Sequence, residues 1–178
     1  MTALRVFQVD SFTRRPFTGN PAGVVIGGEH IDDRQMQALA RELNNSETAF
    51  ILPADAEDHD LQIRFFTPTV EVPSCGHATL AAHYVRASLM NAAPSRVRHK
   101  IGVGLLAADL DLREGDYFVT ITQAPPTISE PYLGAIRAEV VAALGLGEDD
   151  LAEDLPIVRI DTGNPKVMNL GSRSSDSC

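Results

Sequence analysis

The sequence lacks, or has little of, several residue types that mark specialised classes of protein. It has no tryptophan and only two cysteines, and its 15 basic residues are outnumbered by 24 acidic ones, for a formal net charge of -9. Two cysteines in 178 residues do not make a disulfide-rich scaffold. The acidic excess argues against nucleic acid and against an anionic membrane surface, so we expect neither as a partner.

Long apolar runs are absent as well. No stretch approaches the roughly 20 apolar residues of a transmembrane helix, and residues 1–7 lack the apolar segment of a signal peptide. We therefore expect a cytoplasmic protein. What is present is a hydrophobic content of 44%, which in 178 residues suffices for one well-buried core, or for one domain and part of another.

The first fifty residues predict two strands on either side of one helix. Residues 4–10 and 48–52 have the alternation and the β-branched and aromatic content of strands. Asp32 is a favourable N-cap for a helix with one apolar stripe, and Asn44 is a suitable stop. Glu47 is therefore expected between the end of that helix and the start of strand 48–52.

The middle of the chain predicts a buried helix among strands. A turn at residues 73–76 leads into a helix over 78–90 that is apolar on all sides, which is typical of a helix buried on most of its surface. Predicted strands flank it at residues 60–67, 96–104, 105–112 and 117–123. This order favours an α/β (α+β) fold in which a strongly curved, mostly antiparallel sheet wraps around a central helix.

A linker signal divides the chain. Pro125 and Pro126 follow the last of these strands, so we expect a first domain over residues 1–124 and a partial second domain over 125–170. The second domain is predicted to hold a helix at 133–146, an acidic turn at 148–154 and a strand at 157–161. Residues 171–178 have neither periodicity nor apolar content and are expected to be a disordered tail.

A short internal repeat supports two related domains. The strand ending at Asp10 is followed, after a loop, by Thr-Gly-Asn-Pro at residues 18–21, and the strand ending at Asp161 is followed at once by Thr-Gly-Asn-Pro at 162–165. The same strand end and turn residues in the same order favour duplication. The second copy would then be incomplete, since the chain ends before a counterpart of Glu47 appears.

Glu47 and His77 are the residues best suited to acid-base chemistry. Glu47 at a helix-to-strand turn is either an ordinary surface carboxylate or, if partly shielded from water, a group that takes and returns a proton. His77 stands where the buried helix begins, facing the free N–H groups of the first turn, which favours its neutral form. A histidine that only caps the helix is the structural alternative.

The turn before the helix offers further contacts for a ligand. Gly76, Ala78 and Thr79 leave room for a carboxylate to approach the helix N-terminus. Cys75 is either inert packing or a thiol whose pKa the helix end lowers. We expect no metal site, because Cys75, His77 and His83 lack the spacing of zinc ligands. We also expect no cofactor, because the Gly-rich segment 102–107 is followed by a strand pattern and not by the helix of a dinucleotide site.

Several motifs together resemble the phenazine biosynthesis PhzF-like family. They are Val-Asp-Ser-Phe-Thr at residues 9–13, Pro-Phe-Thr-Gly-Asn-Pro-Ala at 16–22, Asn-Ser-Glu-Thr-Ala-Phe at 45–50, Phe-Thr-Pro at 66–68 and Cys-Gly-His-Ala-Thr-Leu at 75–80. The resemblance implies a diaminopimelate epimerase-like fold of two similar α/β domains, with the active site in the cleft between them.

The resemblance also implies a cofactor-independent isomerase. Glu47 would move a proton between carbons of a small carboxylic or amino acid, and His77 would position the substrate or assist protonation. The resemblance also implies a set of substrate-binding residues, several of which lie in the turn before the helix. They are Asn20, Ser46, Ser74, Cys75, Gly76, Ala78 and Thr79.

The sequence leaves open three alternatives to a fully active PhzF-like isomerase. Members of the family bring a Thr-Gly-Ser turn from a complete second domain, and nothing like it follows Ile128, so we expect a truncated product with impaired activity. A non-catalytic relic, or a binding module that forms a homodimer through an exposed apolar patch, is the second alternative. A thiol-based amino-acid epimerase is the third, although it needs a second active-site cysteine and Cys178 lies in a polar tail.

Overall fold

The computed structural model describes residues 4–147, 150–151 and 156–169, and the chain divides into two compact units after Ala124. Each unit is described by itself. Most of the predicted acidic turn at 148–154 and the whole predicted tail at 171–178 lie outside the described residues. Among the described helices, none is long and apolar enough to cross a membrane.

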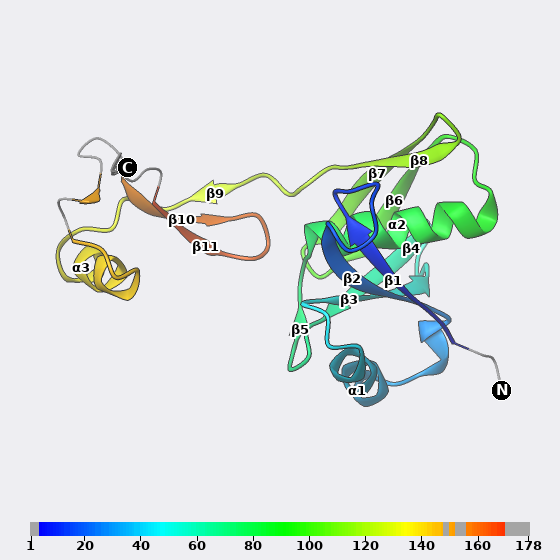
Figure 1. Ribbon diagram of the computed structural model, residues 1–178, viewed down its shortest axis with the longest axis horizontal. Helices are drawn as coiled ribbons and strands as arrows, with labels where there is room; N and C mark the ends of the chain where they lie inside the picture. The colour runs from blue at the N-terminus through cyan, green and yellow to red at the C-terminus, as the bar shows by residue number, and fades with distance from the viewer. Residues whose placement is uncertain (1–3, 148–149, 152–155, 170–178) are drawn as a thin grey trace. The chain divides into compact units, whose positions relative to one another are not determined.

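The first unit is one curled sheet with three helical segments (Figure 1). Its strands are β1 (Arg5–Ser11), β2 (Asn20–Ile26), β3 (Thr48–Pro53), β4 (Leu61–Phe66), β5 (Glu71–Val72), β6 (Ser95–Ile101), β7 (Gly104–Arg113) and β8 (Asp116–Ile121). Its helices are the 3-10 turn η1 (Gly28–His30), α1 (Asp33–Leu43) and α2 (Gly76–Met90).

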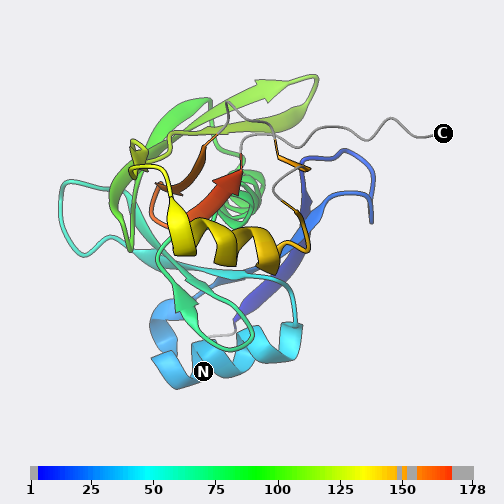
Figure 2. The same cartoon turned by 90° about the vertical axis from the view of Figure 1, so that its left-hand side faces the viewer.

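The sheet is mixed but mostly antiparallel. The strands run in the order β1-β2-β3-β4-β6-β7-β8, with β5 paired to one end of β4. The β2–β3 and β4–β6 pairs are parallel, and the remaining pairs of this sheet are antiparallel. Figure 2 looks along α2 and shows the strands curving around it. The predicted fold class, a curved sheet around a central helix, is confirmed.

Helix α2 is buried over most of its surface because small apolar residues let the sheet pack closely on it. Ala78, Ala81, Ala82, Val85 and Ala87 are at most 5% exposed and lie in the main core cluster with residues of β2, β3, β4, β6 and β7. Alanines let the strands approach the helix closely, so that the sheet can close around it. The helix begins two residues earlier than predicted, because Cys75 already has extended N-cap geometry.

Helix α1 packs on the outer face of the sheet. Asp32 accepts a hydrogen bond from the Gln35 amide at 2.8 Å, and the Gln35 side chain accepts one from the Asp32 amide at 3.0 Å, which makes a complete capping box. Met36 and Ala40 are buried against Val25, Phe50 and Phe66. The helix ends as predicted, at Asn44 in the left-handed conformation with a φ of 53°.

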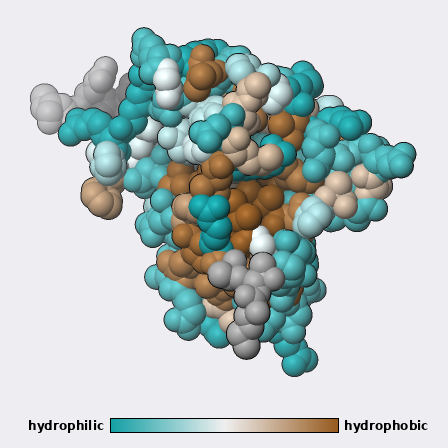
Figure 3. Space-filling model, turned by 90° about the vertical axis from the view of Figure 1, so that its right-hand side faces the viewer, coloured by the Kyte–Doolittle hydropathy of each residue, from teal (hydrophilic) through white to brown (hydrophobic). Residues whose placement is uncertain are grey.

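The curled sheet leaves a groove between its two edge strands. A cavity of about 990 Å³ lies between β1, α2 and β8, with Val9, Leu80 and Val119 among its apolar residues. Apolar residues also gather in the middle of the face that is on the right-hand side of Figure 1 (Figure 3). The groove exists because β1 and β8 do not pair with each other, so one stripe of α2 is not covered by a strand.

The second unit is a small three-stranded sheet and a helix. It comprises β9 (Thr127–Ile128), α3 (Gly134–Ala143), β10 (Ile157–Asp161) and β11 (Lys166–Asn169), with the antiparallel strand order β11-β10-β9. Val141, Leu151 and Ile157 form its core cluster. Helix α3 is shorter at both ends than the predicted helix at 133–146, while β10 has the bounds of the predicted strand 157–161.

The internal repeat has a structural counterpart. In β1 and β2, Asp10 is paired with Pro21. The register of β10 and β11 pairs Ile160 with Lys166, so the next position sets Asp161 opposite Pro165. Each aspartate also accepts a backbone N–H from the following loop, from Phe17 at 2.6 Å and from Gly163 at 2.7 Å. Both aspartates thus lie opposite the proline of the motif and bind a loop amide, although the first loop is longer than the second.

Candidate active site

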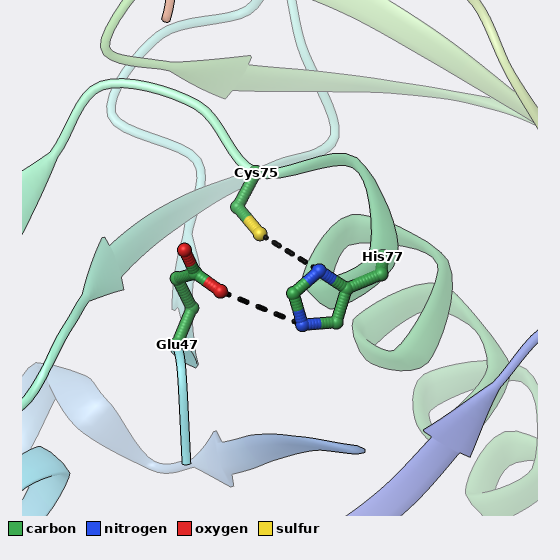
Figure 4. Close-up of side chains that lie close together, drawn as sticks. All are labelled: Glu47, Cys75 and His77. Carbon is green, nitrogen blue, oxygen red and sulfur yellow. Dashed lines mark hydrogen bonds and ion pairs between the residues drawn. The ribbon is translucent and has the colours of Figure 1, made fainter. Parts of the chain in front are cut away.

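The residue just before β3 and the first turn of α2 bring three reactive side chains together (Figure 4). Glu47 directly precedes β3, Cys75 is the N-cap of α2, and His77 lies in the first turn of that helix. The two sequence segments are about thirty positions apart, and the curled sheet makes them neighbours. The structure thus brings together the three candidate residues with titratable side chains.

The imidazole of His77 lies between the other two groups. Its Nε2 is 3.5 Å from Glu47 Oε2, and its Nδ1 is 3.3 Å from Cys75 Sγ. Ser46 Oγ is also 3.3 Å from Nε2. A neutral imidazole carries one N–H, so it donates at one nitrogen and accepts at the other. A thiol that donates to Nδ1 would place the ring proton on Nε2, facing Glu47 and Ser46.

The site is shielded from water but not sealed. The side chain of Glu47 is 20% exposed and that of His77 is 10% exposed. A small ligand can still reach the carboxylate in this position, while the imidazole is held in a fixed orientation. The sequence left open an ordinary surface role for Glu47, and the observed partial burial beside an imidazole is unlike a freely hydrated surface carboxylate.

Strand β2 fixes the backbone of Glu47. The Gly23 amide donates to the Glu47 carbonyl at 3.1 Å, as part of the parallel pairing of β2 and β3. A Cβ on Gly23 would lie 2.6 Å from Thr48 Oγ1, so only glycine permits this approach. The position of the carboxylate therefore depends on close packing between two strands.

Two contacts that the sequence did not predict fix the turn before α2. The buried Ser11 hydroxyl donates to the His77 carbonyl at 2.8 Å and so ties β1 to the helix start. At Gly102, a Cβ would come within 2.7 Å of Pro73 Cα, so the β6–β7 turn packs directly on the turn that leads to Cys75. Ser11 follows the predicted strand 4–10 directly and is the last residue of the observed β1, and no local pattern distinguishes it from a solvent-facing serine.

Of the two alternatives that the sequence left open for Cys75, the structure favours an un-ionised, packed thiol over one whose pKa the helix end lowers. Burial raises the pKa of this thiol to about 12, and the nearby Glu47 carboxylate raises it further. The backbone amides of His77 and Ala78 do act in the predicted direction, but they are outweighed. Cys75 is therefore a neutral thiol at pH 7, suited to hydrogen bonding and not to accepting a proton from carbon.

The other predicted substrate-binding residues lie around this cluster but are not equally available. Asn20 is exposed at the start of β2, opposite Ser11 in the strand register, and Ser74 is half-buried in the turn. Gly76 is exposed, and the nearest atom to a Cβ placed there would be Gln123 Nε2 at 3.7 Å.

Ala78 and Thr79 are less suited to direct contact. Ala78 is fully buried in the core. The amide and the hydroxyl of Thr79 both point to the Cys75 carbonyl, at 3.0 and 2.7 Å. Thr79 thus stabilises the first turn of α2, and a ligand can reach this region only through the amides that precede it.

His83 does not lie with Cys75 and His77. His83 is 1% exposed in the core, and its Nε2 is 3.2 Å from Nδ1 of the equally buried His99. Among the described residues, the group of donors that does converge is Glu47, Cys75 and His77, with one ligand atom of each within 4.8 Å of the others. Sequence spacing could not reveal it, because Glu47 comes from another element.

Comparisons with known proteins give consistent matches. A family model described as phenazine biosynthesis-like protein matches residues 9–176. An uncharacterized isomerase of Clostridium acetobutylicum is 47% identical over 163 residues, which are 92% of this chain and 54% of the relative.

Solved structures agree in fold. The crystal structure of a PhzF-family phenazine biosynthesis protein from Bacillus anthracis matches with a TM-score of 0.75 and 31% identity, over 93% of this chain and 55% of that one. The structure of a predicted epimerase from Pseudomonas aeruginosa matches with a TM-score of 0.83 and 26% identity, over 93% and 58%. The chain spans about half the length of the relatives that it matches.

Proposed function

This chain belongs to the phenazine biosynthesis-like, or PhzF-like, family, whose curated relatives include uncharacterized isomerases, and from that premise we propose that it carries the acid-base half of a cofactor-independent isomerase site. The substrate would be a small carboxylic or amino acid. The reaction would remove a proton from one carbon and return it to another carbon.

Glu47 is the proposed base. Its carboxylate takes the proton from the substrate C–H, becomes a carboxylic acid, and returns the proton at the new position. The electron pair of the broken C–H bond is delocalised into the adjacent unsaturated group of the substrate until the proton is returned. One residue can serve in both steps because the proton stays on Glu47 between them.

His77 is the proposed donor beside the base. A Cys75 thiol that donates to Nδ1 would leave the ring proton on Nε2, where it would face both Glu47 and any ligand bound over the site. A neutral imidazole that donates a hydrogen bond can stabilise negative charge as it develops on the substrate.

The substrate carboxylate would bind at the N-terminus of α2. The first turn of this fifteen-residue helix contains no acidic residue, and Gly76 is exposed there. The helix dipole favours an anion at this end, and the exposed Gly76 leaves room for one. A carboxylate held there would lie next to His77 and within reach of Glu47.

The observation that supports this proposal best is the contact between Glu47 and His77 at 3.5 Å, with both side chains largely shielded from water. A general base needs a fixed neighbour and partial desolvation, and an ordinary surface glutamate has neither.

The test is exchange of substrate C–H protons with deuterated solvent, followed by proton NMR over a panel of small carboxylic and amino acids. We expect the chain to catalyse exchange for at least one compound and Glu47→Gln to lose it by about 10²–10⁴-fold, since this is the usual contribution of a general base. Glu42→Gln, which changes an exposed carboxylate near the end of α1, is the matched control.

Equal exchange by the chain and by Glu47→Gln would show that Glu47 is not the base. No exchange by the unaltered chain on any compound would favour the competing function, a non-catalytic module that associates through an exposed apolar surface such as the groove between β1, α2 and β8. Sizing chromatography over a range of concentrations would then detect the association.

A further inference from the structure

We propose that Glu47, Cys75 and His77 bind a zinc ion that reversibly blocks the active site. One carboxylate oxygen, one sulfur and one imidazole nitrogen of these residues lie within 4.8 Å of one another. Within the part of the chain that the structure describes, no other group of three such donors converges in this way.

The distances are close to those of a coordinated ion. Zinc bonds of about 2.0–2.3 Å in tetrahedral geometry place neighbouring ligand atoms roughly 3.3–3.6 Å apart. Cys75 Sγ and His77 Nδ1 are 3.3 Å apart already. The Glu47 carboxylate, whose side chain is 20% exposed, must move toward them for the ion to bind.

The remaining ring nitrogen also has a partner in the zinc-bound form. One imidazole gives a single nitrogen to one ion, so binding through Nδ1 leaves the proton on Nε2. Ser46 Oγ, 3.3 Å from Nε2, is placed to accept it. Histidine ligands of zinc usually donate their second N–H in this way, which holds the ring in place.

The chemical types of these three ligands indicate which metal ion would bind. Thiolate and imidazole are ligands of zinc and of cobalt, whereas magnesium and calcium require oxygen ligands. The helix N-terminus repels a cation, but the Cys75 thiolate and the Glu47 carboxylate supply two negative charges against the two positive charges of the ion. Binding must release the thiol proton, so it weakens at low pH. Three protein ligands leave the fourth position to water.

The blocking role rests on the proposed function, because it assumes that Glu47 is the base. A carboxylate that coordinates zinc cannot accept a proton from carbon, and a zinc-bound His77 is fixed in place. Zinc and substrate would therefore compete for one site. The metal site itself does not depend on catalysis and can be tested separately.

Cobalt absorption is the direct test. The full chain with Cys178→Ser keeps Cys75 as its single thiol. After treatment with EDTA, added Co²⁺ should produce a thiolate-to-cobalt charge-transfer band with one ion per chain, and Zn²⁺ should abolish it. Adding Cys75→Ser should remove the band, and Glu47→Gln or His77→Gln should weaken binding by at least about 10–100-fold. His30→Gln, at an exposed histidine, is the control and should change nothing.

The outcomes separate the two proposals. A missing band, or a band unchanged in Glu47→Gln and His77→Gln, overturns the zinc site even if the EDTA-treated chain exchanges substrate protons. A band that requires all three residues supports the site even if no exchange is found. Where exchange is found, Zn²⁺ should inhibit it competitively with substrate and EDTA should restore it; inhibition that is not competitive, or that EDTA does not reverse, would contradict the block.

Discussion

At the scale of single residues, the environment of Cys75 sets its chemistry. The thiol is held neutral because it is buried and because a carboxylate is its neighbour, and both factors outweigh the helix amides. Its hydrogen bond to His77 Nδ1 then fixes which nitrogen of the ring faces Glu47. In the proposed mechanism Cys75 would therefore act through His77, as a residue that positions the donor.

A neutral thiol should resist alkylation. The pKa of Cys75 is raised from 9.0 to about 12, so the folded protein holds about 1,000-fold less thiolate at pH 8 than the unfolded chain. We expect iodoacetamide to modify Cys75 at least that much more slowly in buffer than in urea, with a rate that still rises with pH above 9. Mass spectrometry of the peptide that contains Cys75 measures it.

Glu47→Gln provides the control for that experiment. It removes the negative charge that adds to the rise in the pKa of Cys75 but leaves the burial. Alkylation of the folded variant should therefore be faster than that of the unaltered chain and still slower than in urea. Rapid alkylation of the unaltered folded chain would show that the thiol is ionised.

The sequence could suggest Glu47, Cys75 and His77 but not their contacts. Each stands at a turn beside an apolar element, and their motifs resemble those of one family. The distances between them depend on the way that β3 and α2 meet, and on supports such as Ser11 and Gly102. Those supports are hydrogen bonds and packing contacts between residues far apart in the chain, which leave no local pattern.

At the scale of elements, α1 and α2 differ in what determines their ends. Helix α1 carries its own signals, a capping box at Asp32 and a left-handed Asn44, and its bounds were predicted correctly. Helix α2 has no side-chain cap, and its start is defined by the contacts of Cys75 and Ser11 with distant parts of the fold. Local rules therefore predict the first helix better than the second.

The capping box predicts a stability effect. Asp32→Ala should lower the free energy of unfolding by about 1 kcal/mol, because it leaves the amide of Gln35 without its acceptor. Urea unfolding followed by circular dichroism measures the change. Asp32→Asn retains an acceptor and should lose much less. A loss as large in Asp32→Asn as in Asp32→Ala would mean that the cap does not act through this hydrogen bond.

At the scale of the whole molecule, stability should depend on pH through the buried pair His83 and His99. Burial lowers the pKa of His83 from 6.5 to about 3, with His99 and Arg86 adding to the effect, and burial lowers that of His99 to about 4. Both rings are therefore neutral in the folded protein at pH 5, while the unfolded chain binds a proton on each.

The difference in bound protons between the folded and the unfolded chain determines how stability changes with pH. Because the unfolded chain binds more protons below pH 6.5, the free energy of unfolding should fall by up to about 2.7 kcal/mol per pH unit between pH 6 and 4.5. The pKa values of Asp33 and Asp60 are lowered by hydrogen bonds to Arg64 and to the Arg98 amide, so these carboxylates contribute below that range. Urea unfolding at a series of pH values measures the slope.

Single variants test the assignment. His83→Gln or His99→Gln should remove about half of the slope, whatever each does to stability at pH 7, and His30→Gln, at an exposed position, should leave it unchanged. A free energy of unfolding that is constant from pH 6.5 to 4.5 would contradict the pKa values of the buried pair.

The repeated Asp and Thr-Gly-Asn-Pro segments show which strand pairings can be predicted from the sequence and which cannot. They predicted two related strand pairs, and both pairs have the same register about Asp10 and Asp161. The parallel pairing of β2 with β3 had no such signal, because it joins strands separated by α1. That pairing is what carries Glu47 to the start of α2.

The contact of Gly23 with Thr48 has a practical consequence for engineering. A methyl group added at residue 23 would press on the residue next to Glu47 without touching any group that takes part in chemistry. Gly23→Ala would therefore push β3, and with it the backbone of Glu47, away from β2 and displace the carboxylate. Reactivity could thus be adjusted from the neighbouring strand, with every reactive atom left in the protein.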